Sequence, residues 1–153
     1  MRMHVLLLSL LLVPLAPKAG DHAGTDPVEA EAEAVAMKMV DAWNTMEWDR
    51  MIGLFAEDAV FQSMMKEPVI GRETIRPRFL ALVDGIERIE LQIRNMAING
   101  NVVFLERVDD FVYKGKHSRV PVVGVLEIAD GEVQAWRDYY DWAQLEEALT
   151  VEE

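Results

Sequence analysis

The sequence predicts an α+β domain in which helices pack on one side of a curved sheet. Before Gly85 apolar residues recur at helical spacing, whereas after it "IERIELQIRNMAI" begins a regular alternation of apolar and polar residues. Glycine-containing turns divide this second half into four long segments, which favours a meander of antiparallel strands. A sheet curled around helices makes a cone, so we expect an interior pocket lined by its concave face.

The length and charge of the chain narrow its function. A chain of 153 residues, 51% hydrophobic and 27% charged, is typical of one globular domain. Its net charge of −12 argues against nucleic acid or an anionic membrane as a partner, since both bind basic patches. The chain has no cysteine, and its three histidines are scattered without metal-ligand spacing. We therefore expect no metal and no cofactor.

Residues 1–24 are typical of a signal peptide followed by a linker. Arg2 precedes an apolar run from Val5 to Val13 that is too short to span a bilayer comfortably. Cleavage after Ala19 would put Pro17 where a small residue is preferred, so an uncleaved anchor and a misassigned start stay open as alternatives. We expect a secreted or periplasmic protein (cytoplasmic if the start is misassigned) with a single domain over residues 25–153.

The helices are expected early in that domain. Asp26 and Pro27 predict an N-cap and a first helical position. The helix that follows has an apolar face formed by Val28, Ala32, Val35, Met39 and Trp43. Further segments are predicted as a short helix over residues 48–55, a strand over 59–65 and a helix over 71–85.

The remaining segments are predicted strands. They cover residues 86–98, 101–113, 119–128 and 133–142, and a short helix follows over 143–149. The turns between the strands are predicted at Asn99-Gly100, residues 114–118 and Asp130-Gly131.

One of these strands, "LERVDDF", carries charge on a face that should be buried. Residues two apart share a face, so Arg107 and Asp109 lie between Leu105 and Phe111. In the last strand Asp138 shares a face with two aromatic residues, but aromatics occur on both faces, so periodicity does not say which face is inward. If Arg107, Asp109 and Asp138 point inward, two carboxylates and a guanidinium form an acid–base device. Surface ion pairs or a structural bridge are the alternative interpretation.

At these residues the sequence resembles a known family. "LERVDDF" followed by "VVGVLEIADGEVQAWRDYYDWAQLEEAL" resembles the limonene-1,2-epoxide hydrolase family of the NTF2-like (SnoaL-like) superfamily. The similarity is strongest from Val102 to Leu149 and weaker from Val28 to Arg72. It implies a cone-shaped, curved mixed or antiparallel sheet wrapped around N-terminal helices, with an apolar interior pocket. It also implies a homodimer formed through the sheet.

The resemblance assigns roles to the three charged residues. It implies that Asp138 is the general base, which takes a proton from water, and that Asp109 is the general acid, which protonates the epoxide oxygen. Arg107 would bridge the two carboxylates. The implied reaction is one-step hydrolysis of a small hydrophobic epoxide to a vicinal diol, without a metal or a covalent intermediate.

The residues that position the water depart from the family pattern. The family holds its water with a Tyr and an Asn in a Y-x-N motif, and the matching residues here are Phe61 and Ser63. Phe61 has no hydroxyl, and the side chain of Ser63 is shorter than that of Asn. We therefore expect weaker water positioning, a different substrate, or binding without turnover.

The rest of the pocket is expected to be apolar. Strand register and position in the family give these candidate lining residues, each of which could equally be core: Leu82, Ile86, Phe111, Val120, Val122 and Tyr140. Two other functions stay open. One is an isomerase, dehydratase or polyketide-type cyclase of the same superfamily, which the lack of an inward His disfavours. The other is a non-catalytic binder of an apolar small molecule.

Overall fold

The computed structural model describes residues 26–63 and 66–150, so the predicted leader lies outside the described residues. The elements in chain order are α1 (Pro27–Asn44), α2 (Trp48–Gly53), β1 (Phe55–Ser63), β2 (Val69–Ile70), α3 (Arg72–Val83), β3 (Ile86–Asn99), β4 (Val102–Tyr113), β5 (Lys116–Ala129), β6 (Glu132–Tyr140) and α4 (Trp142–Leu149). None of the helices in these residues is long and apolar enough to cross a membrane.

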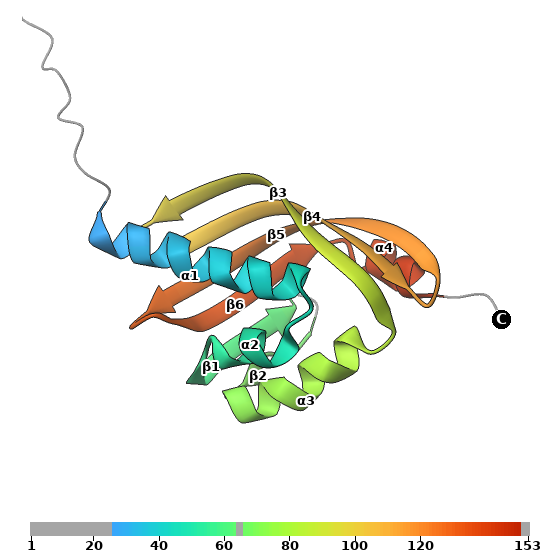
Figure 1. The fold of residues 1–153 in the computed structure, drawn as a ribbon, viewed down its shortest axis with the longest axis horizontal. Coiled ribbons are helices and arrows are strands. Elements are labelled where there is room, and N and C mark those ends of the chain that lie inside the picture. Colours follow the sequence, from blue (N-terminus) through green and yellow to red (C-terminus); the bar gives the residue numbers. More distant parts are fainter. Residues whose placement is uncertain (1–25, 64–65, 151–153) are drawn as a thin grey trace, which may run out of the picture.

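The strands form one six-stranded sheet in the order β2-β1-β6-β5-β4-β3 (Figure 1). Strands β3 to β6 are the predicted antiparallel meander. The early strand β1 runs parallel to β6 and antiparallel to β2, so the sheet is mixed. Because of this parallel pairing, the early strand lies beside the last strand of the chain.

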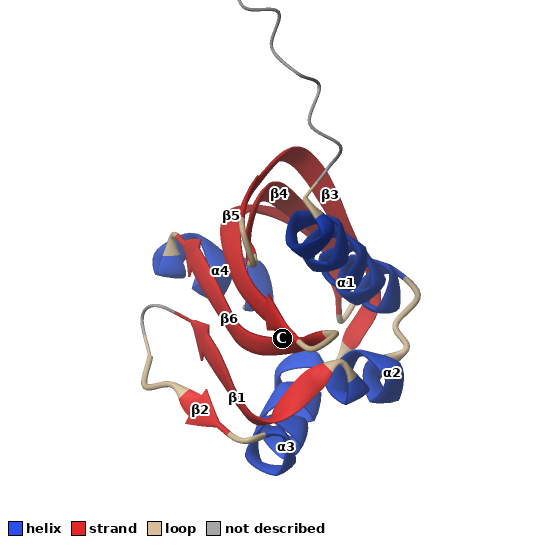
Figure 2. Cartoon of the chain, turned by 90° about the vertical axis from the view of Figure 1, so that its left-hand side faces the viewer, coloured by secondary structure: helices blue, strands red, loops and turns tan. Residues whose placement is uncertain are grey.

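The helices cover the concave side of a sheet that is curved but not closed. Figure 2 shows β3 to β6 bending in an arc with α1 lying within it. Helix α1 begins as predicted, since Asp26 accepts a hydrogen bond from the Val28 backbone N–H at 2.9 Å. Its buried face joins the inward face of the sheet in one hydrophobic core. The predicted α+β fold with N-terminal helices packed on a curved sheet is confirmed.

Some predicted boundaries are wrong where tertiary contacts outweigh the local pattern. The second helix ends at Gly53, and Phe55 instead begins β1, where it is fully buried and pairs with Val133 of β6. The two-residue edge strand β2 was not predicted, because only its pairing with β1 makes Val69–Ile70 a strand.

Three boundaries in the meander also differ from the prediction. Asn99 pairs with Val102, so the first tight loop is Gly100-Asn101 with Gly100 at a φ of 59°. Tyr113 pairs with Lys116, which moves the start of β5 into the predicted turn. The last strand ends at Tyr140, and Asp141 caps α4, so Trp142 is helical rather than extended.

Candidate active site

Strand β4 directs its unusual charges into the cone. Leu105 and Phe111 are buried on the concave face, and the two residues between them on that face are Arg107 and Asp109. The Arg107 side chain is 2% exposed, and that of Asp109 is 18% exposed. Asp138 of β6 also faces inward, with 15% of its side chain exposed. The puzzling face of "LERVDDF" is therefore the interior face.

Arg107 binds both carboxylates through its planar fork of N–H groups. Its Nε and Nη2 donate to the two carboxylate oxygens of Asp109, at 2.7 and 3.2 Å. Its Nη1 and Nη2 donate to the two oxygens of Asp138, both at 3.0 Å. A planar guanidinium with several fixed donors suits such double recognition. One arginine thus fixes the two carboxylates relative to each other.

Gly124 makes room for this bridge. In the β4–β5–β6 register Gly124 lies opposite Leu105 on one side and Asp138 on the other. A Cβ at this position would overlap Arg107 Nη1 and would lie 3.0 Å from Asp138 Oδ1. Any side chain here would displace the guanidinium, so the ion bridge requires a glycine at this point of β5.

Trp136 donates a further hydrogen bond to the carboxylate of Asp138. Its Nε1 donates to Asp138 Oδ1 at 2.7 Å, and Arg107 lies over its ring at 5.6 Å from the centroid. Together with the two donors of Arg107, this gives Asp138 three hydrogen bonds that stabilise its negative charge. The carboxylate is therefore held in one orientation by three donors.

The two carboxylates occupy different environments. Burial raises the pKa of Asp109, and this effect together with the charge of Asp138 outweighs the opposing influence of Arg107. For Arg107 burial acts to lower the pKa, but the charges and hydrogen bonds of Asp138 and Asp109 more than compensate and raise it. Asp109 is thus suited to carry a proton, while Arg107 stays charged.

A pair of hydroxyls lies beside Asp138. The parallel pairing of β1 and β6 places Ser63 opposite Asp138. The Ser63 hydroxyl is hydrogen-bonded to the Tyr140 hydroxyl, which lies two residues along β6 on the same face as Asp138. Burial raises the pKa of Tyr140, so its hydroxyl keeps its proton. Phe61 faces the same cavity and contributes a ring to its wall.

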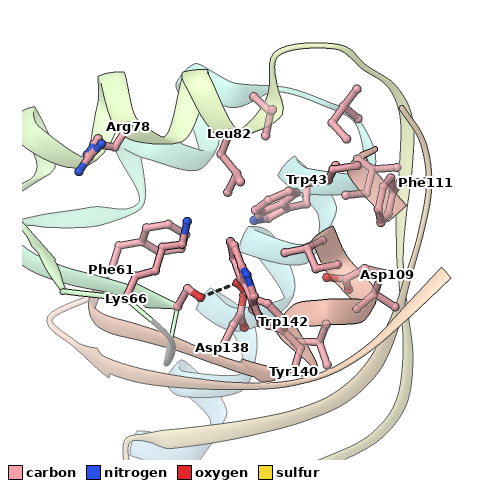
Figure 3. A pocket seen from close by; sticks show the side chains of 18 of the residues that line it. Trp43, Phe61, Lys66, Arg78, Leu82, Asp109, Phe111, Asp138, Tyr140 and Trp142 are labelled. Atoms are coloured by element: carbon pink, nitrogen blue, oxygen red, sulfur yellow. Dashed lines mark hydrogen bonds between the residues drawn. The ribbon is translucent and has the colours of Figure 1, made fainter. Parts of the chain in front are cut away.

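These groups line a cavity of about 470 Å³, which suits a small organic molecule (Figure 3). All six lining residues proposed from the sequence are in its wall: Leu82, Ile86, Phe111, Val120, Val122 and Tyr140. Eleven further residues of the wall were not predicted: Trp43, Lys66, Glu67, Val69, Arg78, Ala81, Val83, Ile89, Trp142, Leu145 and Leu149. Those of α4 were missed because the local pattern predicts a helix over 143–149 but not that this helix packs against the cavity.

The neighbouring aspartate, Asp110, belongs to the opposite face. It is buried on the convex side, where it contacts Arg88 at 2.6 Å, His117 at 3.0 Å and Arg119 at 3.3 Å. Hydrogen bonds from His117 and Arg88 lower its pKa. His117 therefore lies in β5 as a partner of Asp110 and does not face the cavity.

Residues 36–136 match the SnoaL-like domain family, two thirds of the chain. The chain belongs to the SnoaL-like family. Among curated proteins, this SnoaL-like chain is similar to epoxide hydrolase EphG of Mycobacterium tuberculosis, with 26% identity over 103 residues, which are 67% of this chain and 68% of the relative. The SnoaL-like superfamily and the curved fold predicted from the sequence are thus confirmed.

Solved structures share the same fold. An M. tuberculosis LEH-like epoxide hydrolase matches the SnoaL-like domain with a TM-score of 0.70 and 24% identity over 80% of this chain and 92% of that chain. A Jannaschia protein, described only provisionally as a SnoaL-like polyketide cyclase, matches with a TM-score of 0.73 and 18% identity over 85% and 99%. A Catenulispora acidiphila protein with a ketosteroid isomerase-like fold matches with a TM-score of 0.65 and 23% identity over 72% and 87%.

Proposed function

We propose that this protein hydrolyses a small hydrophobic epoxide to a vicinal diol in one step. Asp138 is the base, Asp109 is the acid and Arg107 holds both. The observation that carries the proposal is the Arg107 bridge, which joins two carboxylates of different environment in the wall of a largely apolar cavity. The names of a curated protein and of a solved structure, each an epoxide hydrolase of M. tuberculosis, support the same reaction class.

The reaction balances with these groups alone. Asp138 takes a proton from a water molecule as the water oxygen attacks an epoxide carbon. The bond between that carbon and the epoxide oxygen breaks, and Asp109 gives its proton to the leaving oxygen. The diol then contains both oxygens. Both carboxylates keep some contact with solvent, through which the proton passes from Asp138 back to Asp109.

The attacking water is assigned to the Ser63–Tyr140 pair. These two hydroxyls lie next to Asp138 and can hold a water with two hydrogen bonds. Tyr140 thereby supplies the phenol that Phe61 lacks, from a neighbouring strand. Orientation of the attacking group contributes strongly to such reactions, so Tyr140→Phe should slow turnover, whereas Tyr139→Phe on the convex face should not.

The proposal is tested by offering a panel of hydrophobic epoxides to the protein and to matched asparagine variants. Asp109→Asn and Asp138→Asn should each lower kcat about 10²- to 10⁴-fold, the usual contribution of a general acid or base. Asp110→Asn, next in the chain but on the convex face, is the control and should keep activity per folded molecule. Circular dichroism checks that the fold is kept. Full activity in Asp138→Asn would refute the assigned roles.

An isomerase or cyclase is the second candidate, and the observation that favours it is Phe61, which has no hydroxyl with which to hold a water. The same carboxylate pair could move a proton within a substrate, and relatives with a ketosteroid isomerase-like fold share this architecture. That function requires no held water and fits the loss of the tyrosine at Phe61. A rearranged product without added oxygen would identify an isomerase or cyclase.

A non-catalytic binding protein would give a third result. A ligand that binds equally well to wild type and Asp109→Asn without turnover would indicate this function.

A further inference from the structure

Three charged side chains line the cavity apart from those of the Arg107 bridge. Lys66, Glu67 and Arg78 are part of its wall, and all three are exposed to solvent. Figure 3 shows Lys66 and Arg78 at one side of the cavity and Asp109 at the other. We call the part of the wall formed by Lys66, Glu67 and Arg78 the outer end. A ligand in the cavity still meets water there.

Arg78 is directed to the outer end by its position on α3. Leu82 lies one helical turn further on and also lines the cavity, so the two residues share one face of the helix. Arg76 of the same helix contacts Asp49 at 2.5 Å. Arg78, in contrast, forms no ion pair with any residue that the structure describes. Its guanidinium is therefore available to a ligand.

Lys66 is held against the cavity wall and does not extend freely into solvent. Its Nζ lies 4.0 Å from the centroid of the Trp142 ring, which belongs to the part of the wall that α4 forms. A ring face attracts an ammonium group, but the three N–H donors of that group can still bind an anion. Among the residues described, neither Lys66 nor Glu67 takes part in an ion pair.

The balance of charge at the outer end restricts what it binds. Two positive charges and one negative charge give it a net charge of +1, in a chain whose net charge is −12. A group with a single negative charge balances this, whereas a phosphate monoester carries about −1.5 to −2 and exceeds it. A carboxylate has a single charge, and its two oxygens match the paired N–H donors of a guanidinium.

The inner part of the cavity determines how such a ligand lies. Its epoxide must reach Asp109 and Asp138, and a carboxylate beside these two would add a third acidic group to the same place. The anionic end of the ligand therefore points to the outer end. There it keeps its contact with water and loses little hydration, while the apolar wall covers the rest of the molecule.

We propose that Lys66 and Arg78 bind a carboxylate of the substrate, so that the substrate class is a hydrophobic epoxide with a carboxylate at the end remote from the epoxide ring. This inference rests on the proposed function, because it assumes that the cavity holds the epoxide. It goes further by naming a second functional group and the residues that recognise it.

The test compares an epoxide that ends in a carboxylate with its methyl ester. In the wild type kcat/KM should favour the carboxylate about tenfold, the effect of a hydrogen bond between charged groups that stay partly in water. The double variant Lys66→Gln/Arg78→Gln should lower this ratio to about one. Circular dichroism checks that the fold is kept.

A second double variant controls for the net charge of the chain. Lys38→Gln/Arg94→Gln removes the same two charges from exposed positions that do not line the cavity, so it should keep the wild-type ratio. An equal fall of the ratio in both double variants would show that the charge of the whole chain is responsible, and it would overturn the carboxylate site.

Glu67 gives an effect of opposite sign. Glu67→Gln removes the negative charge of the outer end, so the preference for the carboxylate should increase about twofold, as for an exposed pair of charges. Because the outer end is exposed, added salt should weaken the preference. A lower ratio in Glu67→Gln would overturn the charge balance on which the site depends.

A binding measurement separates this inference from the proposed function. Saturated analogues of the carboxylate and of the ester, without the epoxide, are titrated by calorimetry into wild type and Lys66→Gln/Arg78→Gln. A carboxylate preference that the double variant abolishes, with no diol formed from any epoxide, would keep the carboxylate site and reject the hydrolase. Equal affinities or no binding in the wild type, or a preference that survives in the double variant, would overturn the carboxylate site even if epoxides are hydrolysed.

Discussion

At the scale of single residues, Arg107 is the group that allows two carboxylates to share one cavity. Burying like charges together is costly, and a guanidinium bonded to both offsets their repulsion and their loss of hydration. The bridge does not make the carboxylates equal, since burial raises the pKa of Asp109, whereas Asp138 accepts hydrogen bonds from three donors, two on Arg107 and one on Trp136. That asymmetry gives one acid and one base.

The dependence of this bridge on Gly124 gives the first prediction. Gly124→Ala places a methyl group on a strand that cannot move away, so the Arg107 guanidinium must leave its two partners. We expect kcat/KM to fall about a hundredfold or more, and stability to fall by about 3 kcal/mol, as when a buried ion pair is broken. Chemical denaturation and steady-state kinetics measure the two effects.

A second glycine is the matched control for this change. Gly53→Ala in α2 adds the same methyl group where nothing lies within 4 Å, and it should leave both stability and activity close to those of the wild type. If Gly124→Ala behaves like Gly53→Ala, the close approach of Arg107 to this backbone is wrong.

The pKa of Asp109 gives a prediction for pH. The general acid must be protonated, so kcat/KM should fall as the pH rises through the raised pKa of this carboxyl. Folding stability should change over the same range, because the pKa of Asp109 is higher in the folded than in the unfolded protein. Protonated Asp109 therefore favours the folded state at low pH, and this contribution to stability is lost as the pH rises through that pKa. Asp110→Asn should leave the profile unchanged. A kcat/KM that increases with pH across this range would contradict the assignment of Asp109 as the acid.

At the scale of elements, the long strands and the helices could be predicted from the sequence, whereas the two-residue strand β2 and several element boundaries could not. Alternation over ten or more residues predicted β3, β4 and β5, and it placed Arg107 and Asp109 on one face. Alternation could not tell which face of β6 points inward, because aromatic residues occur on both of its faces. The pairing of Asp138 with Gly124 of β5 shows that the face with Asp138 is the inner one. Strand β2 depends on its pairing with β1, which the local pattern of Val69–Ile70 does not contain.

Helix α4 gives the prediction at this scale. It contributes Trp142, Leu145 and Leu149 to the cavity wall, and Asp141 caps it by accepting from two backbone N–H groups at 2.9 and 3.3 Å. Asp141→Ala should cost about 1 kcal/mol and raise KM for a hydrophobic substrate, because the wall loosens.

The control for the α4 prediction is the other capping aspartate. Asp26→Ala removes the same kind of cap from α1, whose first turn does not line the cavity, so it should cost similar stability and leave KM unchanged. Thermal unfolding gives the stability of both variants, and steady-state kinetics gives their KM values. An equal rise of KM in both would show that general loosening, and not the wall of α4, is responsible.

At the scale of the whole molecule, the cavity depends on how the helices cross the sheet. The sheet residues of the wall could be proposed from the sequence, because strand register determines which side chains share the concave face. It could not place Trp43 in the wall, because that requires the angle at which α1 crosses β3 to β6. Local patterns do not encode that angle.

The family resemblance predicts a homodimer formed through the sheet, and we propose that exposed apolar residues on the convex face form its interface. Phe104, Val123 and Tyr139 are 41%, 40% and 44% exposed there, on three adjacent strands. A charged residue at the centre of an apolar interface is strongly unfavourable, so Val123→Glu should convert a dimer into a monomer in sedimentation velocity. Met37→Glu, at an exposed apolar position on α1, is the control. A wild type that sediments as a monomer would refute the dimer.

The most direct test of the central claim is a single turnover in ¹⁸O-labelled water, with enzyme in excess over a hydrophobic epoxide that it hydrolyses. Direct attack by water held at Asp138 predicts one labelled oxygen in every diol molecule and no label in the protein. A carboxylate that attacked the epoxide itself would give unlabelled diol in the first turnover and would leave ¹⁸O in Asp109 or Asp138 after hydrolysis of the ester. Mass spectrometry of the diol and of the peptides containing these residues distinguishes the two, and label in either aspartate would contradict the one-step mechanism.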